Sequence, residues 1–188
     1  MGVSKQTDFW TTRLNGNDPT SPVGDNNTAW TLNAGIGGDG VSQNGYWRIS
    51  SSGGGQLWKQ TVADADNDLT LMCAIHVESV PNDGEVIMAL DNGTHRVEVH
   101  SDGSFDKLKL VGATTTTSNN LDLAMNEQEA VPCILRLTLS SDGIARLYMR
   151  EIIEDDDAQQ HYLQVSAQSS SAQGAFFGTT SGTVDFYS

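Results

Sequence analysis

The sequence predicts an all-β fold, an antiparallel two-sheet β-sandwich, from one clear hairpin near the C-terminus and from short strand patterns that recur along the chain. In the hairpin, residues 133–154 read CILRLTLSSDGIARLYMREIIE, with apolar residues at alternate positions on both sides of an Asp142-Gly143 turn. The apolar set is Cys133, Leu135, Leu137, Leu139, Ala145, Leu147, Met149 and Ile153. A period of two is typical of a strand with one buried face, so this unit predicts two paired strands over a core.

Similar strand-like runs occur throughout the rest of the chain, separated by Asn, Asp and Gly turn signals at 81–84, 91–93 and 101–103. The runs are residues 9–14, 29–32, 46–50, 56–61, 69–78, 85–90, 95–100, 105–111, 161–166, 175–178 and 183–187. Residues 15–28 and 34–45 are expected to be surface loops, and 114–120 a further loop. Only a short helical turn is expected, at 121–129.

The length of 188 residues predicts a single domain over residues 1–188, from which an N-terminal arm and the loops of residues 1–45 extend. The formal net charge of −14 repels nucleic-acid phosphates and anionic lipids, so neither a nucleic-acid partner nor a membrane partner is expected. The start, MGVSKQTDFW, lacks the basic segment and apolar run of a secretory signal. We therefore expect synthesis in a host cytoplasm without export.

Two cysteines, Cys73 and Cys133, lie on the apolar phase of their strands and are expected to be buried free thiols. Motifs for catalysis or cofactor binding are weak. Gly35, Gly37 and Gly40 match GxGxxG, but a strand pattern follows where the dinucleotide fold needs a helix. The alternating aspartates at 64, 66 and 68 lack the rest of a calcium loop and are expected to form a solvated turn. No nucleophile elbow or metal-spaced histidine set is present, so the chain is not expected to be an enzyme.

Polar and aromatic residues on the outward phase of two strands are the candidate ligand-binding residues. They are Arg96, Glu98 and His100 in one strand, and Arg146, Tyr148 and Arg150 in the other. The alternative for the first group is a charge ladder that stabilises the sheet. The sequence leaves both interpretations open, with the ladder favoured.

Taken together, the hairpin CILRLTLSSDGIARLYMREI and the ending FFGTTSGTVDFYS resemble the concanavalin A-like lectin/glucanase superfamily, and among its members the laminin-G-like jelly-roll modules. The segments YWRISSSGGGQLWKQ and DLTLMCAIHVES extend the resemblance over most of the chain. The resemblance implies two antiparallel sheets and carbohydrate or protein binding. It also implies a structural calcium at Asp185, although a plain surface aspartate is the favoured interpretation. The ExDxxE strand of the glucanase branch is absent. Glu151 and Glu154 are spaced by three, which places them on opposite faces of a strand, so glycoside hydrolysis is not expected.

These observations favour a non-enzymatic virion structural protein, such as a bacteriophage capsid decoration (cement) or tail protein. It would bind capsid or tail proteins of the same virion and form homo-oligomers, without any cofactor beyond the calcium considered above. The alternative function is a lectin-like carbohydrate-binding module. In that case Trp47, Trp58 or Tyr148 would stack on a glycan, while the charged candidates would bond its hydroxyls.

Overall fold

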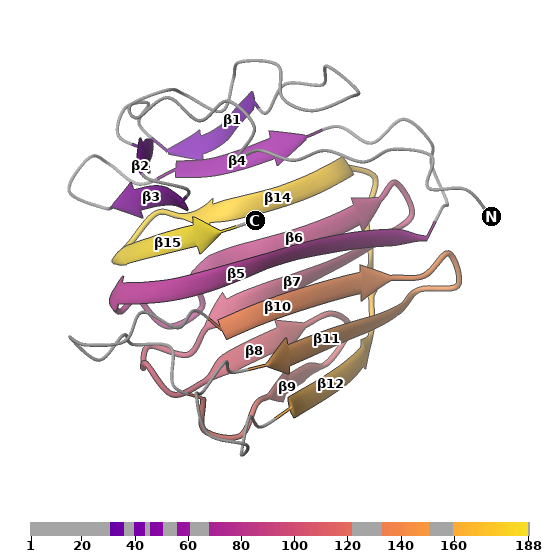
Figure 1. Ribbon diagram of the computed structural model, residues 1–188. Helices are drawn as coiled ribbons and strands as arrows, with labels where there is room; N and C mark the ends of the chain where they lie inside the picture. The colour runs from indigo at the N-terminus through magenta and orange to yellow at the C-terminus, as the bar shows by residue number, and fades with distance from the viewer. Residues whose placement is uncertain are drawn as a thin grey trace.

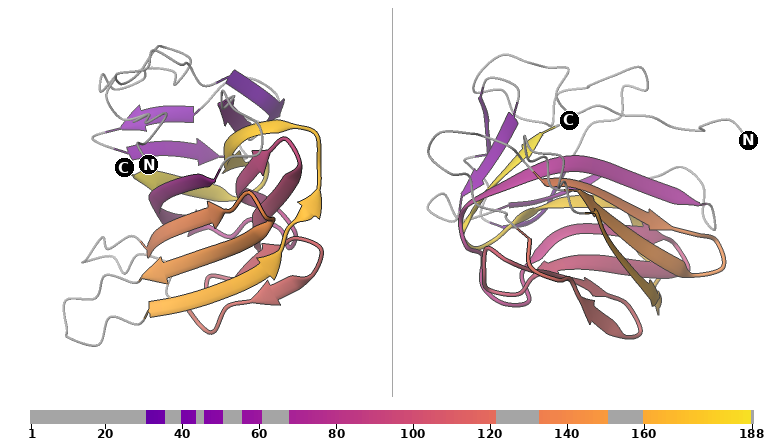
Figure 2. Two further views of the ribbon diagram at one scale, coloured as in Figure 1. Left: turned by 90° about the vertical axis from the view of Figure 1, so that its right-hand side faces the viewer. Right: turned by 60° about the horizontal axis from the view of Figure 1, so that its bottom comes forward.

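The computed structural model describes residues 31–35, 40–43, 46–50, 56–60, 68–121, 133–150 and 160–187. Within these ranges all regular structure is β-strand, and the strands form two antiparallel sheets stacked as layers (Figures 1 and 2). The predicted antiparallel β-sandwich is confirmed.

Sheet A has eight strands and sheet B has seven. In spatial order, sheet A consists of β1 (Thr31–Gly35), β4 (Gln56–Gln60), β14 (Gln173–Thr179), β6 (Val86–Asn92), β7 (His95–Ser101), β8 (Leu108–Val111) and β9 (Thr115–Thr117), with β13 (Gln168–Ser169) paired to β7. Sheet B consists of β12 (Gln160–Ser166), β11 (Ile144–Arg150), β10 (Cys133–Leu139), β5 (Leu69–Ser79), β15 (Thr183–Tyr187), β3 (Tyr46–Ser50) and β2 (Gly40–Gln43). Strands distant in sequence are thus neighbours, as a sandwich requires.

The predicted hairpin is the pair β10–β11. Leu137 lies opposite Leu147 in β11 and opposite Leu71 in β5, and these leucines are buried. Gly143 has a φ of 81° in the turn, and its N–H donates to the Ser140 carbonyl at 3.0 Å. A Cβ at this glycine would lie 2.8 Å from the His95 ring, so both the backbone conformation and the close approach require glycine.

Apolar side chains from both sheets fill the space between the layers. Phe177 of β14 meets Phe186 of β15 edge to face, with ring centroids 5.1 Å apart. Cys73 and Cys133 are buried free thiols, as predicted. Burial raises the pKa of the Cys73 thiol, and the neighbouring Cys133 adds to this effect, so the thiol stays protonated.

Two expectations about loops were wrong. The predicted loop at 34–45 contains β2, whose Gly40 lies opposite Ile49 of β3. The predicted loop at 114–120 contains β9, whose Thr117 lies opposite Lys109 of β8. Residues 40–43 have weak local strand propensity, which pairing with β3 outweighs, whereas the threonines of β9 favour a strand by themselves. The strand expected at 9–14, the N-terminal arm and most of the helical turn expected at 121–129 lie outside the described residues.

At one side of the sandwich the edge strands of the two sheets lie next to each other, β9 of sheet A beside β12 of sheet B (Figure 1). The Ala113 N–H, between β8 and β9, donates to the Ser166 carbonyl at 2.8 Å. A Cβ at Gly112 would lie 2.3 Å from that same carbonyl oxygen, so only glycine allows the backbones to approach this closely. The β8–β9 connection therefore joins one sheet to the other.

Within the part of the chain that the structure describes, no helix is long and apolar enough to cross a membrane.

Candidate functional site

The six predicted ligand-binding residues fall into two groups on different sheets. Arg96, Glu98 and His100 lie on the outward face of β7 in sheet A, and Arg146, Tyr148 and Arg150 lie on the outward face of β11 in sheet B. Since the outward faces of the two layers of a sandwich point away from each other, the two groups do not form one site. Each is therefore a separate candidate.

The first group is tied together by hydrogen bonds along its own strand. Arg96 Nε donates to Glu98 Oε1 at 2.6 Å, and His100 Nε2 lies 2.7 Å from Glu98 Oε2. Residues i and i+2 share one face of a strand, so the three side chains point to the same side. A charge ladder was the favoured alternative for this row; these two hydrogen bonds run along the strand, and a further ion pair crosses from Arg96 to the neighbouring strand β6.

Two further residues from neighbouring strands complete this group, which we call the Glu98 cluster: Asp91, Arg96, Glu98, His100 and Phe176. Asp91 of β6 lies opposite Arg96 and is fully buried, with its Oδ2 3.6 Å from Arg96 Nη1. The Arg96 guanidinium carbon lies 4.6 Å above the centre of the buried Phe176 ring of β14. The arginine is thus held by two carboxylates and an aromatic face.

The electrostatics of the Glu98 cluster favour a structural role. The hydrogen bond from His100 lowers the pKa of Glu98 to about 2 against the effect of burial, and Arg96 also lowers it. Glu98 therefore stays ionised, and both of its oxygens are occupied. A general acid needs a raised pKa and free access to substrate, so this carboxylate does not suit acid catalysis.

The second group is part of a larger surface on sheet B. Four side chains on consecutive strands, which we call the outer strip, lie in one row across the outward face: Tyr162 of β12, Tyr148 of β11, Arg136 of β10 and Met72 of β5. The tyrosine rings are 5.2 Å apart and tilted by 54°, and the Arg136 guanidinium carbon lies 4.3 Å above the Tyr148 ring. Met72 is 62% exposed and Tyr162 is 51% exposed. These two are the large hydrophobic residues that the described surface leaves open.

Arg146 and Arg150 flank the outer strip along β11. Arg146 Nε donates to Gln164 Oε1 at 3.1 Å, and the Tyr162 hydroxyl also donates to that oxygen. Arg150 is exposed. The sequence pattern identified the β11 residues but missed Met72, Arg136 and Tyr162. Their alternation places them on outward faces, yet only the pairing register shows that they meet.

Asp185 is buried and paired with Arg48 and His76, in contrast to the surface aspartate or calcium ligand expected from the sequence. Its two oxygens accept hydrogen bonds from Arg48 Nε and Nη2, both at 2.8 Å, and His76 Nδ1 lies 3.3 Å away. Burial acts to raise the pKa of Asp185, but the hydrogen bonds from Arg48 and His76 outweigh it and hold the pKa below its usual range. Because a guanidinium occupies both oxygens, the geometry argues against calcium at this position.

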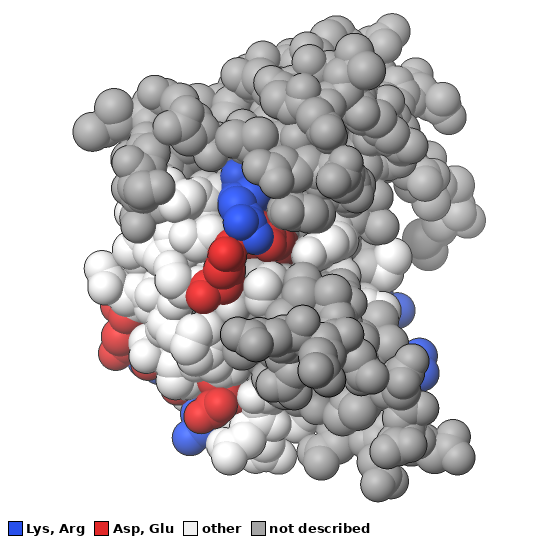
Figure 3. All heavy atoms as spheres, turned by 60° about the vertical axis from the view of Figure 1, so that its left-hand side comes forward, with Lys and Arg blue, Asp and Glu red and all other residues white. Residues whose placement is uncertain are grey.

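Arg48 also pairs with Glu78, so this end of sheet B joins one arginine to two carboxylates. Figure 3 shows basic and acidic side chains next to one another on this side of the molecule, without a large patch of either sign among the described residues. Each of these carboxylates is paired with Arg48, and the group keeps one net negative charge.

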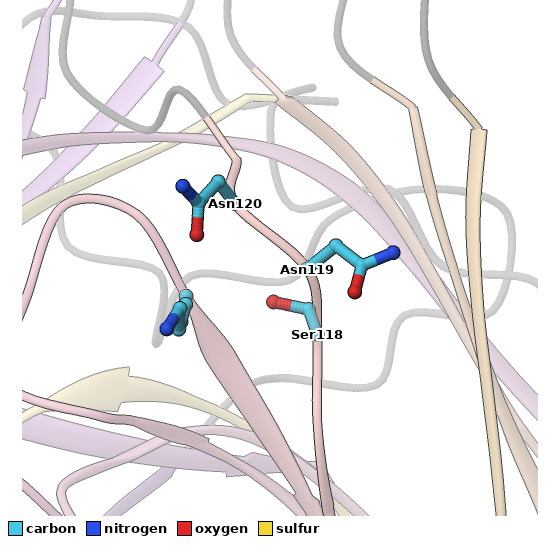
Figure 4. Close-up of a pocket in the computed structure, with 4 residues that line it drawn as sticks. Ser118, Asn119 and Asn120 are labelled. Atoms are coloured by element: carbon cyan, nitrogen blue, oxygen red, sulfur yellow. The ribbon is translucent and has the colours of Figure 1, made fainter.

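A shallow hollow of 440 Å³ is lined by Lys107, Ser118, Asn119 and Asn120. The Asn119 and Asn120 side chains point in different directions, as Figure 4 shows. Ser118 Oγ accepts a hydrogen bond from the Leu108 N–H at 3.1 Å. These polar groups do not converge on a common point, which a specific small-molecule site requires.

The remaining motifs give no site. Gly35 ends β1 and Gly40 begins β2, so the GxGxxG match is followed by a strand, where the dinucleotide fold needs a helix. Asp68 accepts a hydrogen bond from the Ser141 N–H at 2.7 Å, while Asp64 and Asp66 lie outside the described residues.

The side chains of Trp47 and Trp58 are likewise not described. Among the described residues, no group of three or more His, Cys, Asp or Glu side chains is placed to hold a metal ion.

Comparison with known proteins assigns no family. No protein-family model matches the chain, and no curated protein matches it. The chain is similar to a crystal structure of a protein of unknown function from Shewanella oneidensis MR-1 with a TM-score of 0.42 and 11% sequence identity, covering 92% of this chain and 76% of that one. A similarity at this level carries no argument about function.

Proposed function

We propose that this protein is a non-enzymatic binding protein that docks the outward face of sheet B onto another protein. The observation that carries the proposal is the outer strip. Met72 and Tyr162 are exposed large hydrophobic side chains at its two ends, with Arg136 and Tyr148 between them. Removing such side chains from water at an interface lowers the free energy of the complex.

The composition of the outer strip supports a protein partner. The centres of protein interfaces are enriched in Tyr, Met and Arg and depleted in Lys, Glu and Asp, and the strip contains only residues of the enriched kinds. With strands about 4.8 Å apart, four strands span about 14 Å. This is the size of the energetic centre of an interface and not of a whole interface.

The framework beneath the outer strip also suits docking. The inward neighbours of the strip residues on β10 and β11, among them Leu135, Leu137, Leu147 and Met149, are buried in the core. The backbone of packed strands loses little further freedom on binding, which favours affinity.

For the biological setting we propose a virion, with the protein acting as a capsid decoration or tail protein and assembling as a homo-oligomer. A rigid β framework that works through surface contact supports this role, because such a role needs no reaction chemistry. Mass spectrometry of purified virions from the source of the sequence tests the setting. Detection at stoichiometric amounts is expected, and absence from every particle would refute the virion role while leaving the docking surface open to test.

Site-specific photo-crosslinking tests the docking surface. A photoreactive phenylalanine analogue replaces Met72 in the full chain, and the same analogue replaces Thr115 of β9, which is exposed on the other sheet, as a control. We expect a cross-linked partner from position 72 that mass spectrometry identifies and that Tyr162→Ser abolishes. Equal products from both positions, or none from position 72, would contradict the proposal.

A glycan is the second candidate ligand, favoured by the exposed Tyr162 ring beside the Arg146–Gln164 hydrogen bond. A glycan array with the native protein and Tyr162→Ala tests it. Binding that depends on Tyr162 would support a lectin-like function, whereas no binding to any glycan would exclude this candidate.

A further inference from the structure

We infer that the partner of the outer strip presents an acidic protein surface, and that the strip does not bind the same strip of a second copy. This inference rests on the proposed docking function and adds the chemistry of the partner. It follows from the charges on and beside the strip.

Three arginines on this face, Arg136, Arg146 and Arg150, have no carboxylate partner among the described residues. Arg136 lies over the Tyr148 ring, and Arg146 donates to the neutral Gln164 amide. By contrast, the structure pairs Arg48, Arg96 and Lys109 with carboxylates. Among the described residues, the outward face of sheet B therefore carries three guanidinium groups without a carboxylate partner, on a chain whose formal net charge is −14.

Beside Asp68, whose carboxylate accepts a hydrogen bond from the Ser141 N–H at 2.7 Å, the described acidic group next to this face is Asp142, in the turn between β10 and β11. Its carboxylate is exposed, and its pKa is lowered chiefly by the hydrogen bond from Ser140, with Arg146 contributing the smallest effect. Asp142 and Arg146 do not form an ion pair in the structure, since the Arg146 Nε donates to Gln164 Oε1. The charged groups of β5 and β15 that share this face, Glu78 and Asp185, are already bound to Arg48.

Docking would remove the three guanidinium groups from water, which is unfavourable unless each gains a partner of opposite charge. Carboxylates match the fork of an arginine and form the strongest hydrogen bonds that it makes. A symmetric dimer through this face would instead bring three arginines of each copy together. An acidic partner is therefore favoured, and self-docking through the outer strip is disfavoured.

The geometry of the aromatic rings favours a protein over an acidic polysaccharide. Arg136 covers one face of Tyr148, and the tilt of 54° between the tyrosine rings leaves no flat pair of rings on which a sugar could stack. Met72, a flexible side chain at the other end of the row, adapts to an irregular protein surface. An anionic sugar is then an alternative outcome of the test.

An NMR titration of the full-length, ¹⁵N-labelled protein with a capped hexaglutamate peptide tests the chemistry directly. We expect amide shift changes confined to β10, β11 and β12, with affinity at least about fivefold weaker in about 0.3 M NaCl because salt screens exposed charges. Arg136→Gln is expected to weaken binding several-fold. Lys107→Gln removes one positive charge from a side chain on another surface and serves as the matched control, expected to bind like the native chain. Thermal unfolding of each variant verifies that it is folded.

Hexaglutamate that leaves these strands unperturbed, or a capped hexalysine peptide that perturbs them equally, would overturn the inference. Shifts with trigalacturonate but not with hexaglutamate would overturn it in favour of an acidic sugar. The photo-crosslink at position 72 separates this failure from failure of the docking function. A cross-linked partner whose contact peptide lacks Asp and Glu, or is the strip of a second copy, would leave docking intact and refute the acidic partner.

Discussion

The outward faces of the two sheets use similar residue types in opposite ways. On sheet A, Arg96 is bound to Glu98, lies near the buried Asp91 and covers Phe176, whose ring is 2% exposed. On sheet B, Arg136 covers Tyr148 but contacts no described carboxylate, and its neighbour Tyr162 is 51% exposed. An arginine over an aromatic ring is thus part of the folded framework in one place and part of an open surface in the other.

The difference shows how to separate stabilising polar groups from binding groups in a β-sandwich. Where charges are neutralised within the chain and shielded from water, removing one of them leaves its buried partner without a counter-charge. Such a substitution therefore lowers the free energy of unfolding. Where charges remain open to solvent, removing one of them changes the stability of the monomer little and instead weakens binding of the partner. Substitutions on the two faces should therefore differ in size.

The largest difference is expected between two aromatic residues. Phe176→Ala should lower the free energy of unfolding by about 3–5 kcal/mol, because it empties a buried site. Tyr162→Ala should lower it by less than about 1 kcal/mol, since the ring is half in water. Urea unfolding followed by tryptophan fluorescence measures both, and equal losses would contradict the distinction between the two faces.

The arginines give the next largest effect. Arg96→Ala leaves Asp91 buried beside no cation and frees one oxygen of Glu98, so we expect a loss of about 2–3 kcal/mol. Arg136→Ala, the matched change on sheet B, should cost about 0.5 kcal/mol. The same unfolding experiment applies, and a loss at Arg136 as large as that at Arg96 would mean that the outer strip also has a structural role.

The pH dependence of stability tests the Glu98 cluster more finely. The pKa of Glu98 falls from 4.5 to about 2 on folding, so its contribution is fully present above about pH 4.5 and is lost as the pH falls toward 2. Glu98→Gln should reduce stability by about 1–2 kcal/mol at pH 7, and the gap from the native protein should narrow below pH 4.5. Asp106→Asn removes an exposed carboxylate as the control. A gap that stays constant with pH would show that the ion pairs of Glu98 do not stabilise the fold.

The smallest effect is expected at Met72. Met72→Thr should change stability by no more than about 0.5 kcal/mol, because the side chain is mostly in solvent and threonine suits a strand. Calorimetry of both proteins measures the change. A loss above about 1 kcal/mol would place Met72 in the packing of the monomer and weaken its assignment to a docking surface.

The fold could be predicted because its signals are local. Alternation in residues 133–150 and the Asp142-Gly143 turn determine the hairpin without help from the rest of the chain. The short strand β2 could not be predicted in this way, since its pairing with β3 makes it a strand, whereas the threonines of β9 are a local strand signal that the loop prediction overlooked.

The candidate surfaces were predicted only in part, because they depend on which strands are neighbours. Arg146, Tyr148 and Arg150 could be placed outward from alternation alone. Their association with Met72 and Tyr162 depends on the order β12, β11, β10, β5, which no local pattern contains. Asp185 illustrates the same limit, because its partner Arg48 is 137 positions away in the sequence.

The close approach of Gly112 to the Ser166 carbonyl has a consequence for the behaviour of the protein at high concentration. Exposed borders of β-sheets can recruit strands from foreign chains and start fibrillar association. Here the Ala113 N–H occupies the Ser166 carbonyl, and the backbone of the β8–β9 connection covers the end of β12. Gly112 thereby helps to prevent strands of other chains from adding to that edge of the sheet.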